Sequence, residues 1–211
     1  MAAKILDLQR ASAGDLDRCR EIIRTGGVIA YPTDTFYGLG ADPANAAAVR
    51  RIFEIKGRQA DQPVIVLLPD RSGVREWAAA VTPFAERLMD RFWPGPLTLV
   101  FRASPRVLPE LTGGTATVGL RVPGSEATRG LLRALGTALT GTSANRSGGA
   151  NPRTAEDVLR DLGGLVDLVI DGGASQEALP STVVDVTGEA PRVLRQGVID
   201  ITLNPPAKEG L

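Results

Sequence analysis

The feature that most constrains the fold is a regular alternation of short apolar runs with segments whose apolar residues have helical spacing. The run at residues 63–68 (PVIVLL) is apolar throughout and has strand length, so it predicts a central strand buried on both faces. Strands alternating with helices predict an α/β fold with a sheet flanked by helices. Further strands are predicted at residues 28–31, 97–101, 117–122, 137–140, 166–170, 182–186 and 191–194.

Helix start signals stand before the amphipathic segments. Residues 15–25 have helical spacing, and Asn45 is a predicted N-cap for a helix that extends to residue 55. Thr154 with Asp157 three residues later predicts a capping box. The other predicted helix openings are Thr82 followed by Pro83, and Ser125.

Glycine-rich and polar stretches separate these elements. Residues 33–35 (TDT) are predicted to run as a loop into Gly38 and Gly40, and residues 141–153 to form a long polar loop. The last two strands lie close together in the sequence, which predicts that the twisted sheet is mixed, with parallel and antiparallel parts. No linker or repeat divides the chain, so we expect one domain at residues 1–205 and a frayed tail at residues 206–211.

The composition excludes several kinds of chemistry. None of the 211 residues is histidine, which removes Ser-His-Asp and Cys-His catalytic pairs and histidine-bound metals. The single cysteine, Cys19, rules out an internal disulfide and a thiolate metal cage, and its helical position predicts a core residue. The 24 basic residues equal the 24 acidic ones, which disfavours a wholesale basic nucleic-acid binder.

The sequence predicts a cytoplasmic protein that does not bind membranes. The opening segment MAAKILDLQR lacks the apolar core of a signal peptide. No run of the chain approaches the ~18 uninterrupted apolar residues of a membrane span. One cysteine also suits a reducing compartment.

Polar clusters occur where strands or helices are predicted to end, which is where α/β sheets build their binding crevices. Each has a simple structural explanation: residues 33–35 fit an Asx or Ser/Thr turn, Lys56 and Arg58 fit cations at a helix C-terminus, and Arg121 fits a salt bridge. Residues 141–145 (GTSAN), followed by Gly148 and Gly149, combine hydroxyls with flexible backbone that can wrap an anion. One ligand with phosphates, a carboxylate and a hydroxyl would explain all the clusters together, which favours a nucleotide and a small polar partner.

An ordered series of motifs resembles the YrdC-like family, and within it the threonylcarbamoyl-adenylate synthases of the short, single-domain form. The motifs are YPTDTFYGLG (31–40), KGR (56–58), WPGPLTLV (93–100), VGLRVP (118–123), TSAN (142–145), STVVDVT (181–187) and VLRQG (193–197). The resemblance implies a YrdC-like fold with a concave ligand-binding cleft. It also implies an enzyme that condenses L-threonine, bicarbonate and ATP into threonylcarbamoyl-AMP and pyrophosphate, the first step of the N6-threonylcarbamoyl modification of tRNA adenosine 37.

The resemblance assigns roles to individual residues. It implies that Arg121 pairs with the threonine carboxylate, and that Lys56 and Asn145 complete a cationic and polar wall. Four residues are implied for catalysis: Lys56, Arg58, Ser143 and Asn145. Those implied for ATP are Arg58, Gln62, Thr117, Ser143, Asn151 and Arg195. Those implied for threonine are Thr35, Arg121, Gly141 and Ser181. Mg²⁺ is expected to arrive with the ATP phosphates, with no metal ligands from the protein.

Two positions depart from the pattern of many relatives. Gln59 stands where they have proline, and Leu67 stands where they have a histidine near the threonine pocket.

A separate transferase complex is expected to receive the product, and tRNA itself is not an expected substrate. Two alternatives remain: a non-catalytic module that binds RNA or a nucleotide, and a related carbamoyl-adenylate chemistry with another acceptor. The 4% aromatic content offers few stacking platforms for RNA.

Overall fold

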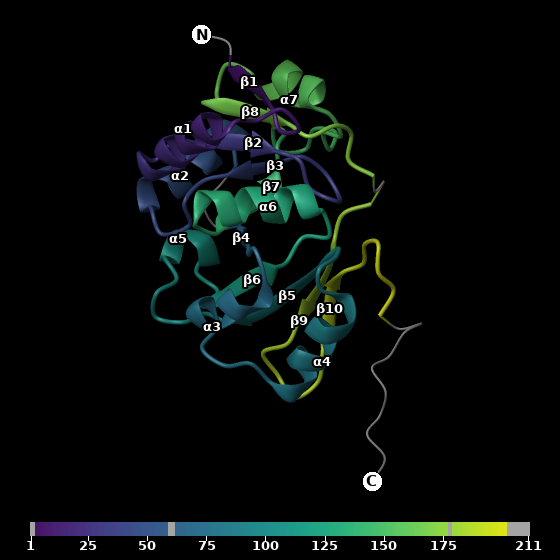
Figure 1. Ribbon diagram of the computed structural model, residues 1–211. Coiled ribbons are helices and arrows are strands. Elements are labelled where there is room, and N and C mark those ends of the chain that lie inside the picture. Colours follow the sequence, from purple (N-terminus) through teal and green to yellow (C-terminus); the bar gives the residue numbers. More distant parts are fainter. Residues whose placement is uncertain (1–2, 59–61, 177–178, 202–211) are drawn as a thin grey trace.

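The computed structural model describes residues 3–58, 62–176 and 179–201, and in this part of the chain ten strands form one mixed sheet (Figure 1). The strands are β1 Lys4–Asp7, β2 Ile29–Tyr31, β3 Gly38–Gly40, β4 Ile65–Leu67, β5 Leu97–Arg102, β6 Thr117–Arg121, β7 Leu139–Ser143, β8 Leu168–Asp171, β9 Thr182–Asp185 and β10 Arg192–Arg195. Their order across the sheet is β1-β8-β2-β3-β7-β4-β6-β5-β9-β10. The predicted strands at residues 28–31, 63–68 and 97–101 are therefore confirmed as β2, β4 and β5.

The sheet combines parallel and antiparallel pairs, as predicted. The pairs β1–β8, β8–β2, β4–β6 and β5–β9 are parallel. The remaining neighbours, including the final pair β9–β10, are antiparallel. Strand β4 lies in the middle of the sheet between β7 and β6, so the prediction of a central strand at residues 63–68 is confirmed.

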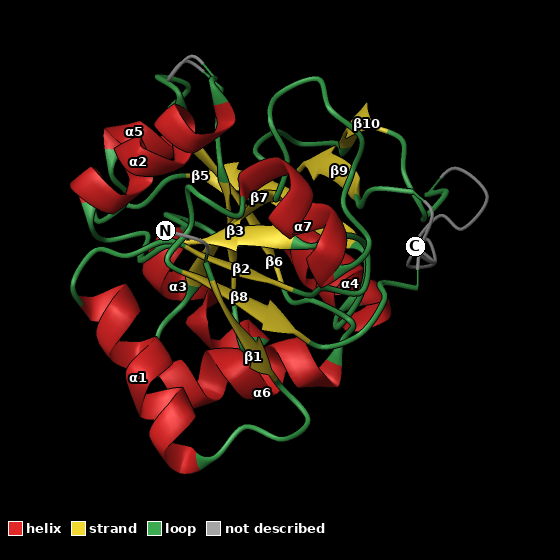
Figure 2. Cartoon of the chain, turned by 90° about the horizontal axis from the view of Figure 1, so that it is seen from above, coloured by secondary structure: helices red, strands yellow, loops and turns green. Residues whose placement is uncertain are grey.

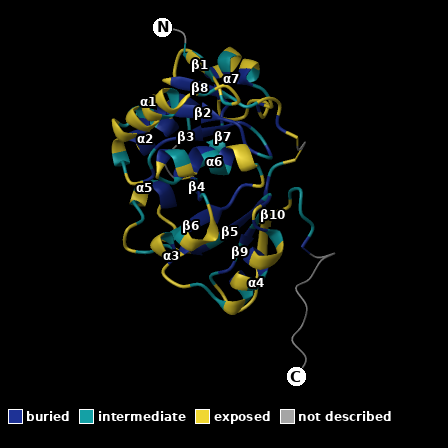
Figure 3. Cartoon of the chain, in the orientation of Figure 1, coloured by how far each residue is buried: buried dark blue, intermediate teal, exposed yellow. Residues whose placement is uncertain are grey.

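Helices cover the sheet and bury three apolar clusters. Helices α1 (Ala13–Arg24) and α6 (Glu126–Leu135) pack on one side of the β1-to-β7 half, and α2 (Ala46–Lys56) and α7 (Ala155–Leu162) pack on the other (Figure 2). The inner strands of both halves are largely buried, whereas the edge strands β1 and β10 and the outer helix faces are exposed (Figure 3). Cys19 on α1 is fully buried, as predicted. The second half is covered by α3 (Val74–Trp77), α4 (Pro83–Phe92) and α5 (Pro109–Thr112), with a short 3-10 turn at Arg71–Gly73 before α3.

The predicted caps begin the helices where expected. Asn45 accepts hydrogen bonds from the backbone N–H groups of the first turn of α2, and Thr82 caps α4 ahead of Pro83. Ser125 caps α6 in the same way. Thr154 and Asp157 form the complete capping box of α7. These local side-chain bonds satisfy N–H groups that the helices leave unpaired, which is why the sequence locates the helix starts well.

Two details of the predicted fold are wrong. Gly38 to Gly40 is strand β3 and not a loop, because it pairs antiparallel with β2 and β7. Glycine is needed at position 40, since a Cβ there would lie 2.7 Å from the ring of Tyr31 on β2. The predicted strand at 137–140 extends to Ser143, so Gly141 to Ser143 belong to β7 and the polar loop starts later. Strand β4, in contrast, is buried on both faces as predicted, since Val66 and Leu67 are at most 2% exposed, and Ile65 and Leu67 also line a cavity.

Some predictions concern residues that the structure does not describe. The predicted domain boundary at residues 205–206 and the predicted tail at 206–211 lie outside the described residues, and so does Gln59. Among the described helices, none is both long and apolar enough to cross a membrane.

Candidate functional site

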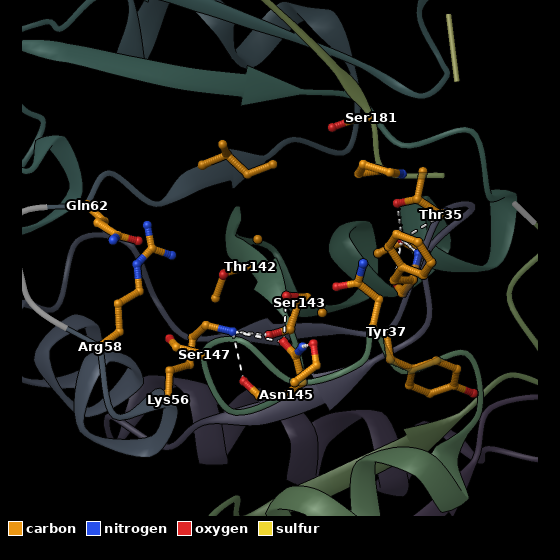
Figure 4. Close-up of a pocket in the computed structure, with 18 of the residues that line it drawn as sticks. Thr35, Tyr37, Lys56, Arg58, Gln62, Thr142, Ser143, Asn145, Ser147 and Ser181 are labelled. Carbon is orange, nitrogen blue, oxygen red and sulfur yellow. Dashed lines mark hydrogen bonds between the residues drawn. The ribbon is translucent and has the colours of Figure 1, made fainter. Parts of the chain in front are cut away.

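A cavity of about 720 Å³ lies over the middle of the sheet and brings together residues far apart in the sequence. Lys56, Arg58 and Gln62 lie at one side of it, and Thr35 and Ser181 lie at the other (Figure 4). Its polar lining comes from the segment after β2, the end of α2, strands β6 and β7, and the segments around β9 and β10. Each contributing segment is one that the sequence marked as a polar cluster.

Lys56 anchors one wall of the cavity. It is the last residue of α2, is only 4% exposed, and donates hydrogen bonds from Nζ to the main-chain oxygens of Ser143 (2.5 Å) and Asn145 (2.9 Å). A third contact reaches Oδ1 of Asn145 at 3.2 Å. The three N–H groups of the ammonium are therefore all bound to oxygens of the chain, and none is left to donate to a ligand. Lys56 can influence a ligand only through its positive charge and through the chain segment that it holds.

Asn145 joins this anchor to the following loop. Its Oδ1 also accepts a hydrogen bond from the Ser143 hydroxyl at 2.7 Å, and its Nδ2 donates to the carbonyl oxygens of Gly149 (2.7 Å) and Ala150 (3.0 Å). Asn145 is 4% exposed, so the side chain is a buried connector. Lys56 of the Lys-x-Arg motif and both polar residues of the Ser-x-Asn motif therefore form one bonded unit, which neither motif reveals alone.

Burial, and secondly the nearby Arg58 charge, lower the pKa of Lys56 from its usual 10.5 to about 8. The cation is present below that pKa and is lost as the pH rises through it. We expect kcat/KM for ATP to decline as the pH rises through about 8. In Lys56→Arg, whose guanidinium stays charged, the decline should move to higher pH. A pH profile of pyrophosphate release for both proteins checks this, and an identical decline in both would exclude Lys56 as its source.

Arg121 dominates the opposite side of the cavity. It is 3% exposed and forms an ion pair with Asp34, Nη2 to Oδ1, at 2.6 Å. Its Nε donates to the carbonyl oxygen of Gly95 at 3.0 Å, and its Nη1 donates to the hydroxyl of Thr35 at 3.1 Å. The salt-bridge explanation offered by the sequence is thus observed, and the same guanidinium also lines the cavity.

Thr33 forms the Ser/Thr turn that the sequence predicted. Its Oγ1 accepts from the backbone N–H groups of Thr35 (3.1 Å) and Phe36 (3.2 Å). Helix α6 supports this turn, because the hydroxyl of Thr128 donates to the carbonyl oxygen of Pro32 at 2.9 Å. The turn places Thr35 beside Arg121. Thr33 and Thr35 therefore belong both to a structural turn and to the lining of the cavity.

Arg195, bonded to Ser181, forms another positively charged part of the cavity lining. Arg195 Nη2 donates to the main-chain oxygen (3.0 Å) and to the hydroxyl (3.2 Å) of Ser181, which also contacts the hydroxyl of buried Thr98 at 2.9 Å. Burial, and secondly the positive charge of Arg121, lower the pKa of Arg195 from its usual value. Two arginines close enough to repel each other are suited to sharing an anion.

All but one of the predicted site residues line this cavity. The exception is Thr117, at the start of β6, whose hydroxyl contacts that of Thr115 at 2.8 Å and which is absent from the lining. The lining members are Thr35, Lys56, Arg58, Gln62, Arg121, Gly141, Ser143, Asn145, Asn151, Ser181 and Arg195. Their ligand roles remain predictions. Sequence reasoning missed Thr142 and Ser147 as lining residues, although both lie in the polar stretch that it singled out.

Comparison with known proteins identifies the group to which this architecture belongs. The family model Sua5_yciO_yrdC, described as telomere recombination, matches residues 21–197. The chain belongs to the Sua5/YciO/YrdC family. Membership confirms both the resemblance predicted from the motifs and the predicted fold class.

Individual Sua5/YciO/YrdC relatives agree in sequence and in structure. A threonylcarbamoyl-AMP synthase of Thiobacillus denitrificans is 44% identical over 164 residues, which cover 78% of this chain and 87% of that protein. The structure of Pyrococcus abyssi Sua5 with L-threonine has a TM-score of 0.88 at 38% identity, covering 93% of this chain and 58% of that one. Escherichia coli YciO has a TM-score of 0.82 at 31% identity, covering 98% of both chains.

These relatives differ in length. The chain spans 52% of the threonylcarbamoyl-AMP synthases of Pyrococcus abyssi and Bacillus subtilis, to which it is 42% and 40% identical. The match with the Thiobacillus protein, in contrast, covers most of both chains. The Sua5/YciO/YrdC family thus includes forms of about this size and longer forms.

Proposed function

We propose that this protein is a threonylcarbamoyl-AMP synthase, which condenses L-threonine, bicarbonate or CO₂, and ATP into threonylcarbamoyl-AMP and pyrophosphate. The observation that carries the proposal is the joining, in one cavity, of a buried carboxylate-pairing arginine, Arg121, with the bonded unit of Lys56, Ser143 and Asn145. One end suits an amino acid and the other suits phosphates. Relatives at 38–44% identity that carry this enzyme name support the assignment.

The reaction needs no protein nucleophile. The threonine amine attacks the carbon of CO₂ and releases a proton to solvent, or attacks bicarbonate with breakage of a C–O bond and loss of water, and either route forms a carbamate. A carbamate oxygen then attacks the α-phosphorus of ATP. The bond between the α-phosphorus and the bridging oxygen to the β-phosphate breaks, and pyrophosphate leaves. The chain's contribution is to hold two anions in line and to stabilise the growing charge with Arg58, Arg195 and the Lys56 ammonium.

Several components of the proposal lie outside the protein. Mg²⁺ enters as part of the ATP substrate and offsets phosphate charge. Among the described residues, no group of three or more His, Cys, Asp or Glu side chains is placed to hold a metal. The product passes to a tRNA threonylcarbamoyl transferase complex. Both reactions take place in the cytoplasm, where ATP and tRNA are available.

Replacing Ser143 by alanine should lower threonine- and bicarbonate-dependent pyrophosphate release by about tenfold or more. The variant removes a hydroxyl that lines the cavity and leaves Oδ1 of Asn145 without its 2.7 Å donor. Pyrophosphate release at saturating threonine, measured against ATP concentration, checks this. Ser72→Ala, which removes a hydroxyl from an exposed turn outside this cavity, is the matched control and should keep wild-type activity.

The alternative of a non-catalytic RNA-binding module predicts different results. Such a module would release no threonine-dependent pyrophosphate from ATP but would bind RNA tightly. If Ser143→Ala retains full activity while the wild type is active, the assignment of this wall to the reaction fails. If the wild type itself is inactive and binds RNA, the module is the better description.

A further inference from the structure

Arg195 lies on an edge strand that has little support of its own. Strand β10 is the last strand of the sheet and pairs only with β9 (Figure 1). All four residues of β10 are exposed. The direction in which Arg195 points therefore depends on the pairing of β10 with β9 and on the chain that follows β10.

A β-bulge in this pairing sets the direction of Arg195. The register shifts between Val193 and Arg195, which pairs with Val183, so Leu194 is an extra residue in β10. A regular ladder would place Leu194 opposite Val183 and would turn Arg195 to the other face of the sheet, because side chains alternate along a strand. With the bulge, Arg195 reaches the hydroxyl of Ser181 at 3.2 Å and lines the cavity.

The hydroxyl of Thr182, at the start of β9, holds the chain that follows β10. Its Oγ1 accepts hydrogen bonds from the backbone N–H groups of Gly197 (3.1 Å) and Ile199 (3.0 Å), and it donates to the carbonyl oxygen of Ile199 at 2.6 Å. One proton and two lone pairs are the full capacity of a hydroxyl, so all of that capacity is used on residues 197–199. Thr182 is fully buried, so water does not compete for these bonds.

Gly197 lets the same segment approach β9 closely. A Cβ at position 197 would lie 2.1 Å from the carbonyl oxygen of Pro180, which excludes any larger residue in this conformation. The backbone N–H of Val198 donates to that same oxygen at 3.0 Å. The chain is thus fixed to the start of β9 only two residues after Arg195. Strand β10 cannot slide by one residue and lose its bulge unless these bonds break.

We propose that Thr182 is a positioning residue for Arg195, because its hydroxyl fixes the register of the bulged strand that turns the guanidinium into the cavity. This inference rests on the proposed function, in which Arg195 stabilises phosphate charge. Thr182 is not among the described residues that line the cavity. Its hydroxyl therefore acts on turnover through residues 197–199 and Arg195, and not by touching a substrate.

The first test is a double-mutant cycle between Thr182 and Arg195, since residues that act through each other have non-additive effects. Thr182→Val keeps the shape of the side chain and removes the hydroxyl, so we expect it to lower kcat/KM for ATP about tenfold or more. Thr182→Ser keeps the hydroxyl and should remain within about threefold of wild type. In an Arg195→Ala background, Thr182→Val should cause less than about a twofold further loss, because no guanidinium remains to position.

Thr140→Val is the matched control for the general effect of removing a buried hydroxyl. Thr140 on β7 is also fully buried, and its Oγ1 accepts from the backbone N–H of Ala41 at 2.9 Å and donates to the carbonyl oxygen of Leu39 at 3.1 Å. We expect this variant to lower the free energy of unfolding, as Thr182→Val does, but to change kcat/KM for ATP less than about twofold. Urea unfolding and pyrophosphate release measure the two effects.

A second measurement uses the wild type alone, in case Thr182→Val does not fold. Amide hydrogen exchange without ATP reports whether Thr182 already holds the backbone N–H groups of Gly197 and Ile199 in the free protein. We expect both amides to exchange at least about a hundredfold more slowly than in an unstructured peptide. Exchange at the rate of an unstructured peptide would show that the segment is not held, and would overturn the role of Thr182.

The kinetic outcomes separate the inference from the function on which it rests. An equal loss for Thr182→Val with and without Arg195, no loss in either background, or an equal loss for Thr140→Val would overturn the positioning role and leave the synthase assignment standing. A wild type that releases no threonine-dependent pyrophosphate would instead refute the proposed function.

Discussion

Replacing Arg121 by methionine should raise the KM for threonine at least a hundredfold and should also lower the free energy of unfolding by about 3 kcal/mol. The first effect follows from losing the donors that face the amino-acid side of the cavity, since a charge-assisted bidentate pair is the strongest contact available to a carboxylate. The second follows because the variant leaves Asp34, whose side chain is 14% exposed, without its ion-pair partner. Steady-state kinetics and urea unfolding measure the two effects separately.

A double variant separates stability from recognition. Asp34→Asn combined with Arg121→Met removes both charges, so unfolding stability should recover substantially while threonine use stays lost. If the double variant regains the wild-type KM for threonine, Arg121 supports the fold and does not bind the carboxylate.

Replacing Arg58 by alanine should lower kcat/KM for ATP at least about a hundredfold, equivalent to about 3 kcal/mol of transition-state stabilisation. Arg58 follows Gly57, the C-cap of α2, and its Nη2 donates to the carbonyl oxygen of Pro63 at 3.2 Å at the edge of the cavity. In the proposed reaction its charge would stabilise the reacting α-phosphate and the departing pyrophosphate. Pyrophosphate release at varied ATP concentrations measures the effect.

Arg50→Ala is the matched control for this variant. Arg50 lies on α2, the helix that ends just before Arg58, and its side chain is 56% exposed in a surface pair with Glu110. Removing such a surface ion pair has little effect on the free energy of unfolding. We expect no effect of Arg50→Ala on kcat/KM for ATP. Comparable losses in the two variants would mean that Arg58 contributes only to the general charge or stability of α2.

Much of the fold could be predicted because its signals are local. Strand β4 follows from an unbroken apolar run, and the N-caps Asn45, Ser125 and Thr154 mark helix starts by bonds within one turn. Strand β3 could not be predicted, because Gly38 to Gly40 has low strand propensity and is held in the sheet by its pairing with β2 and β7. The order of the strands likewise depends on pairings between distant segments that no local pattern encodes.

The candidate site, like the fold, could be predicted from the sequence only in part. The polar clusters and the family resemblance predicted the charged and amide side chains of the lining, because most of these residues lie in recognisable motifs. The contacts that organise the site were beyond the sequence. The pairing of Asp34 with Arg121 and the three oxygens around Lys56 Nζ join segments 87 to 89 residues apart, so only the tertiary structure shows them.

The absence of histidine gains a physical meaning from this geometry. Position 67, where many relatives have histidine, is a leucine that is 2% exposed and lines the cavity. In the proposed mechanism the nucleophile is the carbamate made from the substrate, and the chain supplies position and positive charge. An imidazole is therefore not required for the chemistry.

The central claim is that the cavity joins threonine, bicarbonate and ATP through a carbamate. The most direct test incubates the wild-type protein with ATP, ¹³C-bicarbonate and each amino acid in turn, and measures AMP conjugates by mass spectrometry. The account predicts a conjugate with threonine that contains one labelled carbon, together with an equal amount of pyrophosphate. A threonine conjugate without the label, a conjugate formed preferentially with another amino acid, or no conjugate at all would contradict it.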